Sequence, residues 1–156
     1  MDETTNLRYD VYIAGAMHGR MGFEVLDERD LAKYYCRLFG LTYYDPAEDE
    51  KIDRFKIVDA NPNLELMRHY VEKDERNLDK CRGMLVLTGD KSTSGTAWEM
   101  ARMYYKNCRP IVAVAPRIAK GQLTNFTAVK IYAYETIREA VLELQKRING
   151  DALYFP

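Results

Sequence analysis

The sequence has few residues of the kinds that bind metals or form disulfides, with 3 cysteines and 2 histidines in 156 residues. The cysteines, Cys36, Cys81 and Cys108, are odd in number, widely spaced and without a CxxC pair. This pattern favours reduced, structural thiols over redox or metal-binding roles. Because His18 and His69 are the only histidines, a zinc site built on imidazole is not expected, and we predict neither a metal nor a cofactor.

The chain also lacks an excess of either charge, since 23 lysines and arginines stand against 24 aspartates and glutamates. Without a basic excess, the phosphate contacts that polymeric nucleic acid requires are not expected. The first residues are polar and acidic, and no apolar run approaches the roughly 20 residues that span a bilayer. We therefore expect a soluble, cytoplasmic protein with no membrane partner, and the length predicts a single domain over residues 1–156.

Short apolar runs alternate with longer stretches that have helical spacing. Strands are predicted at Val11–Ala14, Leu41–Tyr44, Met84–Thr88, Pro110–Ala115 and Ile131–Tyr134, and helices at Phe23–Phe39, Leu64–Lys80, Thr96–Asn107 and Glu135–Ile148. Residues 47–63 are charged and form an excursion with room for a short helix. The alternation predicts an α/β fold: a doubly wound, flavodoxin- or Rossmann-like sheet of five mostly parallel strands in the order 2-1-3-4-5, with helices on both faces.

In such sheets, ligands bind beyond the carboxyl ends of the strands, where the winding direction reverses. With this strand order the reversal lies between the first and third strands, and the loops 15–22 and 89–94 meet there. The first loop reads Gly15-Ala16-Met17-His18-Gly19-Arg20-Met21-Gly22. Its glycines allow close backbone approach to a ligand, although it lacks the spacing of a Walker loop or of GxGxxG. The alternative is a flexible loop with solvated His18 and Arg20.

The second loop opens into a helix through Ser92–Glu99. Small hydroxyl residues and glycine between a buried strand and a helix leave backbone N–H groups that bind oxyanions or sugar hydroxyls. Glu99 then lies one turn inside the helix and points into the same crevice. The alternative is that Ser94 caps the helix and Glu99 only complements the helix dipole. Taken alone, Asp74 is part of a charged helix face.

Three stretches together resemble a known family. They are Tyr12-Ile13-Ala14-Gly15 in the first predicted strand, Asp74 ahead of Arg82-Gly83-Met84, and Ser94-Gly95-Thr96-Ala97-Trp98-Glu99. With the strand that follows Pro110, they resemble the nucleoside 2-deoxyribosyltransferase superfamily, which includes the 2'-deoxynucleoside 5'-monophosphate N-hydrolases. The resemblance runs from the first strand through the last helix, and it implies an enzyme that cleaves N-glycosidic bonds.

The resemblance implies a role for each of four residues. Glu99 matches the nucleophile that forms a covalent glycosyl-enzyme intermediate, and a helix N-terminus should keep its carboxylate ionised. Tyr12 matches the tyrosine that orients this nucleophile, although simple core packing is its alternative. Asp74 matches the acidic residue that assists departure of the base. Asn125 resembles a polar residue supplied by a neighbouring subunit, or it is an ordinary loop asparagine.

The two converging loops and the resemblance together give a set of expected substrate-binding residues. They are Gly15, Ala16, Met17, His18, Gly19, Arg20, Thr93, Ser94, Gly95 and Asn125. Thr93 stands where base-exchanging transferases carry an aspartate and where the hydrolases hold a 5'-phosphate with a hydroxyl. Together with His18 and Arg20, it argues for a monophosphate substrate. Ala16 and His18 depart from the hydrolase pattern, and Asn125 is more typical of a transferase.

Two outcomes for the glycosyl-enzyme intermediate therefore stay open: transfer to a free nucleobase and hydrolysis by water. The departures at Ala16, His18 and Thr93 also leave a third reading, a non-catalytic nucleotide-sensing module with the same crevice. The expected partners are a small-molecule nucleoside or nucleotide and a nucleobase acceptor. The resemblance further implies a homo-oligomer, a dimer or higher, with a shared active site. The apolar tail 152–156 is expected to dock near such a site.

Overall fold

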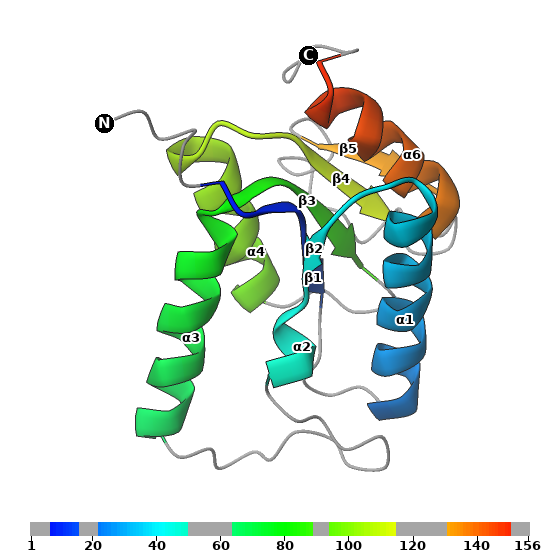
Figure 1. Cartoon of the computed structure of the whole chain (residues 1–156). Helices are drawn as coiled ribbons and strands as arrows, with labels where there is room; N and C mark the ends of the chain where they lie inside the picture. The colour runs from blue at the N-terminus through cyan, green and yellow to red at the C-terminus, as the bar shows by residue number, and fades with distance from the viewer. Residues whose placement is uncertain (1–6, 16–21, 50–63, 89–93, 115–130, 151–156) are drawn as a thin grey trace.

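A computed structural model describes residues 7–15, 22–49, 64–88, 94–114 and 131–150 (Figure 1). Its strands are β1 (Tyr9–Gly15), β2 (Tyr43–Tyr44), β3 (Cys81–Leu87), β4 (Ile111–Val114) and β5 (Tyr132–Tyr134). Its helices are α1 (Gly22–Leu38), α2 (Pro46–Asp49), α3 (Leu64–Leu78), α4 (Ser94–Ala101), the π-helix η2 (Arg102–Lys106) and α6 (Ile137–Ile148). Within these ranges, none of the helices combines the length and the apolar character needed to cross a membrane.

The strands form one sheet in the order β2-β1-β3-β4-β5, and every pair of neighbours is parallel. This confirms the predicted α/β fold and strand order. The longest pairing joins β1 to β3, from Tyr9 opposite Cys81 to Gly15 opposite Leu87. A Cβ atom at Gly15 would lie 2.6 Å from the carbonyl oxygen of Leu87. Glycine is therefore required where these two strands end together.

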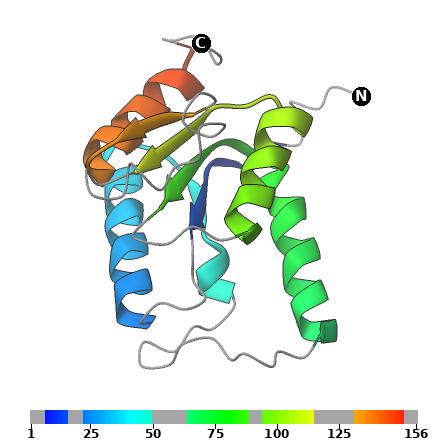
Figure 2. The same cartoon turned by 180° about the vertical axis from the view of Figure 1, so that it is seen from behind.

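Helices cover both faces of the sheet, as Figures 1 and 2 show. Helices α1 and α6 pack on one face, while α3, α4 and η2 cover the other. Because successive side chains of a strand point to opposite faces, Val11 and Ile13 of β1 join the α1–α6 core. Tyr12 and Ala14 join the core beneath α3 and α4. β1 therefore delivers Tyr12 to the face where α3 and α4 run side by side.

Several element boundaries differ from the predicted ones. The predicted helix over Thr96–Asn107 is two pieces, because α4 continues as η2 and Asn107 N–H donates to the carbonyl of Arg102. The wider turn lets Arg102, Lys106 and Asn107 all donate to the carboxylate of Asp79. Helix α6 begins at Ile137 instead of Glu135 because Thr136 caps it and accepts from the N–H of Glu139.

Candidate active site

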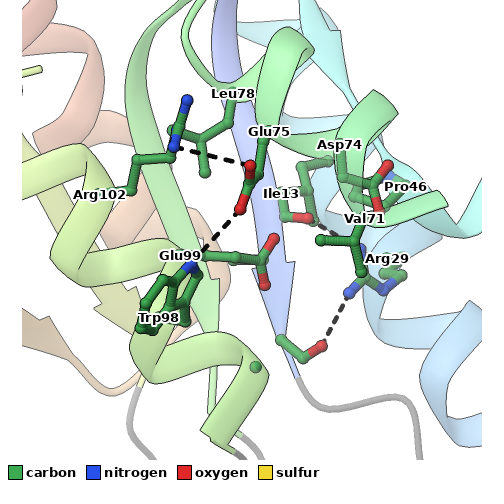
Figure 3. A pocket seen from close by; sticks show the side chains of 13 residues that line it. Ile13, Arg29, Pro46, Val71, Asp74, Glu75, Leu78, Trp98, Glu99 and Arg102 are labelled. Carbon is green, nitrogen blue, oxygen red and sulfur yellow. Dashed lines mark hydrogen bonds and ion pairs between the residues drawn. The ribbon is translucent and has the colours of Figure 1, made fainter. Parts of the chain in front are cut away.

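A cavity of about 410 Å³ lies at the carboxyl end of β1, between α3 and α4 (Figure 3). Its lining residues come from six elements and are Ile13, Ala14, Gly15, Arg29, Pro46, Val71, Asp74, Glu75, Leu78, Gly95, Trp98, Glu99 and Arg102. Gly15 and Gly95 adjoin the two loops that the sequence predicts to converge, and both line this cavity. The cavity therefore lies where the winding of the sheet reverses, between β1 and β3.

Glu99 of α4 points into the cavity and is held from below by the sheet. The Tyr12 hydroxyl donates a hydrogen bond to Glu99 Oε2. Tyr12 is fully buried in the core beneath α4, so its hydroxyl is the polar end of a packed side chain. The hydrogen bond between Tyr12 and Glu99 is the contact that the sequence resemblance implies, and Tyr12 makes it from a buried position in the core.

The protonation of Glu99 departs from the expectation that a helix N-terminus keeps its carboxylate ionised. Burial, reinforced by the nearby charge of Asp74, raises the pKa of Glu99 to about 7. The hydrogen bond from Tyr12 and the charge of Arg29 oppose that rise. The first turn of α4 holds no acidic residue, since Glu99 lies in the second turn, where the dipole is weak and burial prevails.

Burial and the neighbouring Glu99 carboxylate raise the pKa of Tyr12 well above its ordinary value. The phenol therefore stays protonated at neutral pH and remains a hydrogen-bond donor to Glu99. The site holds one phenol that does not ionise beside one carboxyl group that titrates near neutrality.

Asp74 of α3 lines the same cavity and is hydrogen-bonded to a second tyrosine. The Tyr44 hydroxyl donates to Asp74 Oδ1 at 2.9 Å. Tyr44 lies in β2 directly opposite Tyr12 in β1, and the two ring centroids are 5.7 Å apart. Sequence reasoning missed Tyr44, because its place beside Tyr12 depends on the register of two strands that are separated by a whole helix.

Arg29 of α1 is a second residue that sequence reasoning missed. Its guanidinium is buried at the end of β1, where it donates to the carbonyl oxygens of Ile13 at 3.0 Å and Gly15 at 3.1 Å. It also forms an ion pair of 2.6 Å with the buried carboxylate of Asp45. A signal existed in the sequence, since Arg29 lies on the same helical stripe as the buried Ala32 and Cys36. A charged residue on an apolar stripe indicates a buried partner.

Residues of α3, α4 and η2 meet at the opposite wall of the cavity (Figure 3). The Trp98 indole Nε1 donates to Glu75 Oε1 at 3.4 Å, and Arg102 Nη1 lies 3.7 Å from Glu75 Oε2. Arg102 is itself fixed by two hydrogen bonds to Asp79, of 2.9 and 2.8 Å. This chain joins α3 to the α4–η2 segment along one wall.

Other predicted site residues lie outside the described residues. They are Ala16, Met17, His18, Gly19, Arg20, Thr93 and Asn125. The tail 152–156 lies outside them too. Ser94 begins α4 and Gly95 lines the cavity. Among the described residues, no group of three or more histidines, cysteines, aspartates or glutamates is placed to hold a metal ion.

Solved structures of other proteins share this fold. A 2-deoxyribosyltransferase from the psychrotolerant bacterium Bacillus psychrosaccharolyticus matches with a TM-score of 0.63 and 19% identity, over 83% of this chain and 88% of that one. A conserved protein from Enterococcus faecalis V583 matches with a TM-score of 0.63 and 16% identity, over 89% of this chain and 98% of that one. No protein-family model matches the chain, and no curated protein matches it in sequence. The chain therefore has the 2-deoxyribosyltransferase-like fold that the resemblance implies.

Proposed function

We propose that this protein cleaves the N-glycosidic bond of a nucleoside or nucleoside 5'-monophosphate, with Glu99 as the nucleophile. One observation carries the proposal: the Glu99 carboxylate, held by the Tyr12 hydroxyl, shares a cavity with a second carboxyl group, that of Asp74. Enzymes that catalyse substitution at an anomeric carbon usually do so with a pair of carboxyl groups. The fold shared with a 2-deoxyribosyltransferase supports the same reaction class.

In the first step, a Glu99 oxygen attacks the anomeric carbon of the sugar. Because Tyr12 engages Oε2, we assign the attack to Oε1. The bond between Oε1 and the anomeric carbon forms as the bond to the base nitrogen breaks, and the bonding electron pair leaves with the base. Glu99 must be ionised for this attack, and its pKa of about 7 leaves part of the population ionised at neutral pH.

Asp74 would assist the departure of the base. The leaving base gains negative charge at its ring nitrogen unless a proton or a hydrogen-bond donor meets it, and a protonated carboxyl group fits that role. The hydrogen bond from Tyr44 to Oδ1 holds the Asp74 side chain at the cavity. Asp74 therefore serves as the acid of the first step and as the base when the second step needs one.

In the second step, a nucleobase or water attacks the anomeric carbon from the side that the first base has left, and Glu99 departs. Two displacements at one carbon retain its configuration. Transfer to a base is supported by the 2-deoxyribosyltransferase that shares the fold. We include in the proposal a homo-oligomer in which Asn125 reaches a neighbour's sugar site, as the resemblance implies. A cytoplasmic location, expected from the composition, is part of the same proposal.

The test is incubation of the protein with a panel of nucleosides and 5'-monophosphates, with and without a second free base, followed by chromatography. Base exchange would identify a transferase, and base release from monophosphates alone would identify a hydrolase. Intact-protein mass should show a glycosyl adduct that is lost in Glu99→Ala. Nucleotide binding by the wild-type protein with no base released over long incubation would overturn the proposal in favour of a sensing module.

A further inference from the structure

Trp98 combines two properties that rarely occur together. It is the most exposed of the large apolar side chains in the described part of the chain, at 68%. It nevertheless has a polar anchor, because its indole nitrogen donates to Glu75 at 3.4 Å and Arg102 lies 3.7 Å from the same carboxylate. An unanchored aromatic side chain on a surface samples several rotamers, so the anchoring of this one indicates that its position matters.

Trp98 is also one of the residues that line the cavity (Figure 3). Trp98 is the one aromatic residue among the described residues that line this cavity. Val71 of α3, which is 50% exposed, lines the same cavity. The indole N–H is already used by Glu75, so the ring offers its apolar faces to a ligand.

Trp98 directly precedes Glu99 in α4, and this position relates the faces of its ring to the site of the reaction. Adjacent residues of a helix point in different directions, so the two side chains reach different parts of the same cavity. A sugar whose anomeric carbon meets Glu99 carries its base one bond from that carbon. The base must therefore lie within a few ångströms of the carboxylate, in a part of the cavity that offers an apolar wall.

We propose that Trp98, with Val71, forms the subsite for the nucleobase, and that the flat heterocycle of the substrate stacks on the indole. This inference rests on the proposed function, since it places the sugar at Glu99. Stacking on an aromatic side chain suits any base, because every base has a π-face. Glu75 and Arg102 fix the indole in place and are positioning residues for this subsite.

The chain contains a single tryptophan, so its fluorescence reports on this wall alone. The probes are adenine, cytosine and thymine as free bases, and 2-deoxyribose and 2-deoxyribose 5-phosphate as sugars without a base. The free bases should quench or shift the Trp98 emission in a saturable way. The sugar probes should leave it unchanged.

Variants supply the second half of the test, with affinity for the same free bases measured by calorimetry. Trp98→Ala should weaken base binding by about tenfold to a hundredfold, and Trp98→Phe should restore most of it. The matched control is Tyr34→Ala, since Tyr34 is 51% exposed on α1, which packs on the other face of the sheet. Its affinity should equal that of the wild-type protein.

The outcomes separate this subsite from the proposed reaction. Nucleoside cleavage with an unresponsive Trp98 and with full base affinity in Trp98→Ala would overturn the subsite and leave the reaction standing. Base-dependent fluorescence without cleavage would support the subsite and overturn the reaction. If Trp98→Ala changes the mass by light scattering while base affinity is unchanged, Trp98 is a subunit contact and the subsite is wrong.

Discussion

Tyr12 and Tyr44 lie directly opposite each other on β1 and β2, and each donates its hydroxyl to a different cavity carboxylate. Tyr12 reaches up to Glu99 on α4, and Tyr44 reaches Asp74 on α3. Parallel strands with side chains in register place the two phenols side by side, so the sheet sets the positions of both carboxyl groups.

Removing the Tyr12 hydroxyl should change the pH dependence of the reaction. In the wild-type protein, kcat/KM should rise as the pH increases through about 7, because Glu99 attacks only when ionised. The hydrogen bond from Tyr12 lowers the pKa of Glu99, so Tyr12→Phe should move this rise to higher pH. At neutral pH the variant should lose about tenfold in kcat/KM, and the loss should shrink as the pH rises.

The measurement for Tyr12→Phe is kcat/KM over the range in which the protein stays folded, checked by circular dichroism. A loss of the same factor at every pH would contradict the proposed effect on Glu99. It would point instead to an altered position of the nucleophile.

Removing the Tyr44 hydroxyl should affect departure of the base more than attack on the sugar. Tyr44→Phe keeps the ring against Tyr12 but removes the donor to Asp74 Oδ1. We expect kcat to fall by about tenfold for nucleosides whose base is a poor leaving group, and less for those whose base leaves readily. Kinetics on a series of bases tests this, and an equal loss for all of them would remove Asp74 from the role of acid.

The fold could be predicted from the sequence because the patterns that indicate its strands and helices are local. Each strand is a short apolar run, and each helix has its own apolar stripe, so their alternation alone predicts a parallel, doubly wound sheet. The strand β2 shows the limit of this approach. Leu41–Tyr44 is predicted, but only Tyr43–Tyr44 pairs with β1, because an edge strand has one neighbour and its length depends on that neighbour.

Only part of the candidate site could be predicted from the sequence. Tyr12, Asp74 and Glu99 follow from a resemblance of motifs. Asp74 and Glu99 line one cavity, and Tyr12 donates to Glu99 from the core beneath it. Tyr44 depends on the register of two strands that a helix separates, and no local pattern encodes that register. Arg29 does stand out on an apolar helical stripe, but its partners at the end of β1 and at Asp45 are set by the fold. The pKa of Glu99 was also out of reach, because it depends on how deeply the carboxylate is buried.

Replacing Arg29 should destabilise the protein strongly. Arg29 ties the end of β1 to Asp45, which precedes α2, and the Asp45 side chain is fully buried. Among the described residues, Arg29→Met would leave Asp45 with Lys33 as its ion-pair partner, 2.8 Å away. We expect a loss of about 3–5 kcal/mol in the free energy of unfolding, which urea denaturation measures.

A double-mutant cycle supplies the control for Arg29. Asp45→Asn removes the buried negative charge, so Arg29→Met should cost clearly less in that background than in the wild-type protein. Equal costs in the two backgrounds would show that Arg29 acts through the carbonyl groups of β1 alone.

Glu99 should lower the stability of the folded protein at neutral and alkaline pH. Its pKa is raised from 4.5 to about 7 on folding, so between these values the folded state binds more protons than the unfolded state. The free energy of unfolding therefore falls as the pH rises through this window, by on the order of 3 kcal/mol for this group. Glu99→Gln, which stays neutral, should lack that contribution.

The comparison is the urea-unfolding free energy of wild-type protein and Glu99→Gln at about pH 5 and about pH 8. The variant should gain stability relative to the wild type as the pH rises, while its glycosidic activity is lost. Glu139→Gln, at an exposed site on α6, is the matched control and should show no such gain. A constant difference between wild type and Glu99→Gln at both pH values would mean that Glu99 is already ionised at the lower one. Burial would then not be what sets its protonation, and the activity of the wild-type protein should persist well below neutral pH.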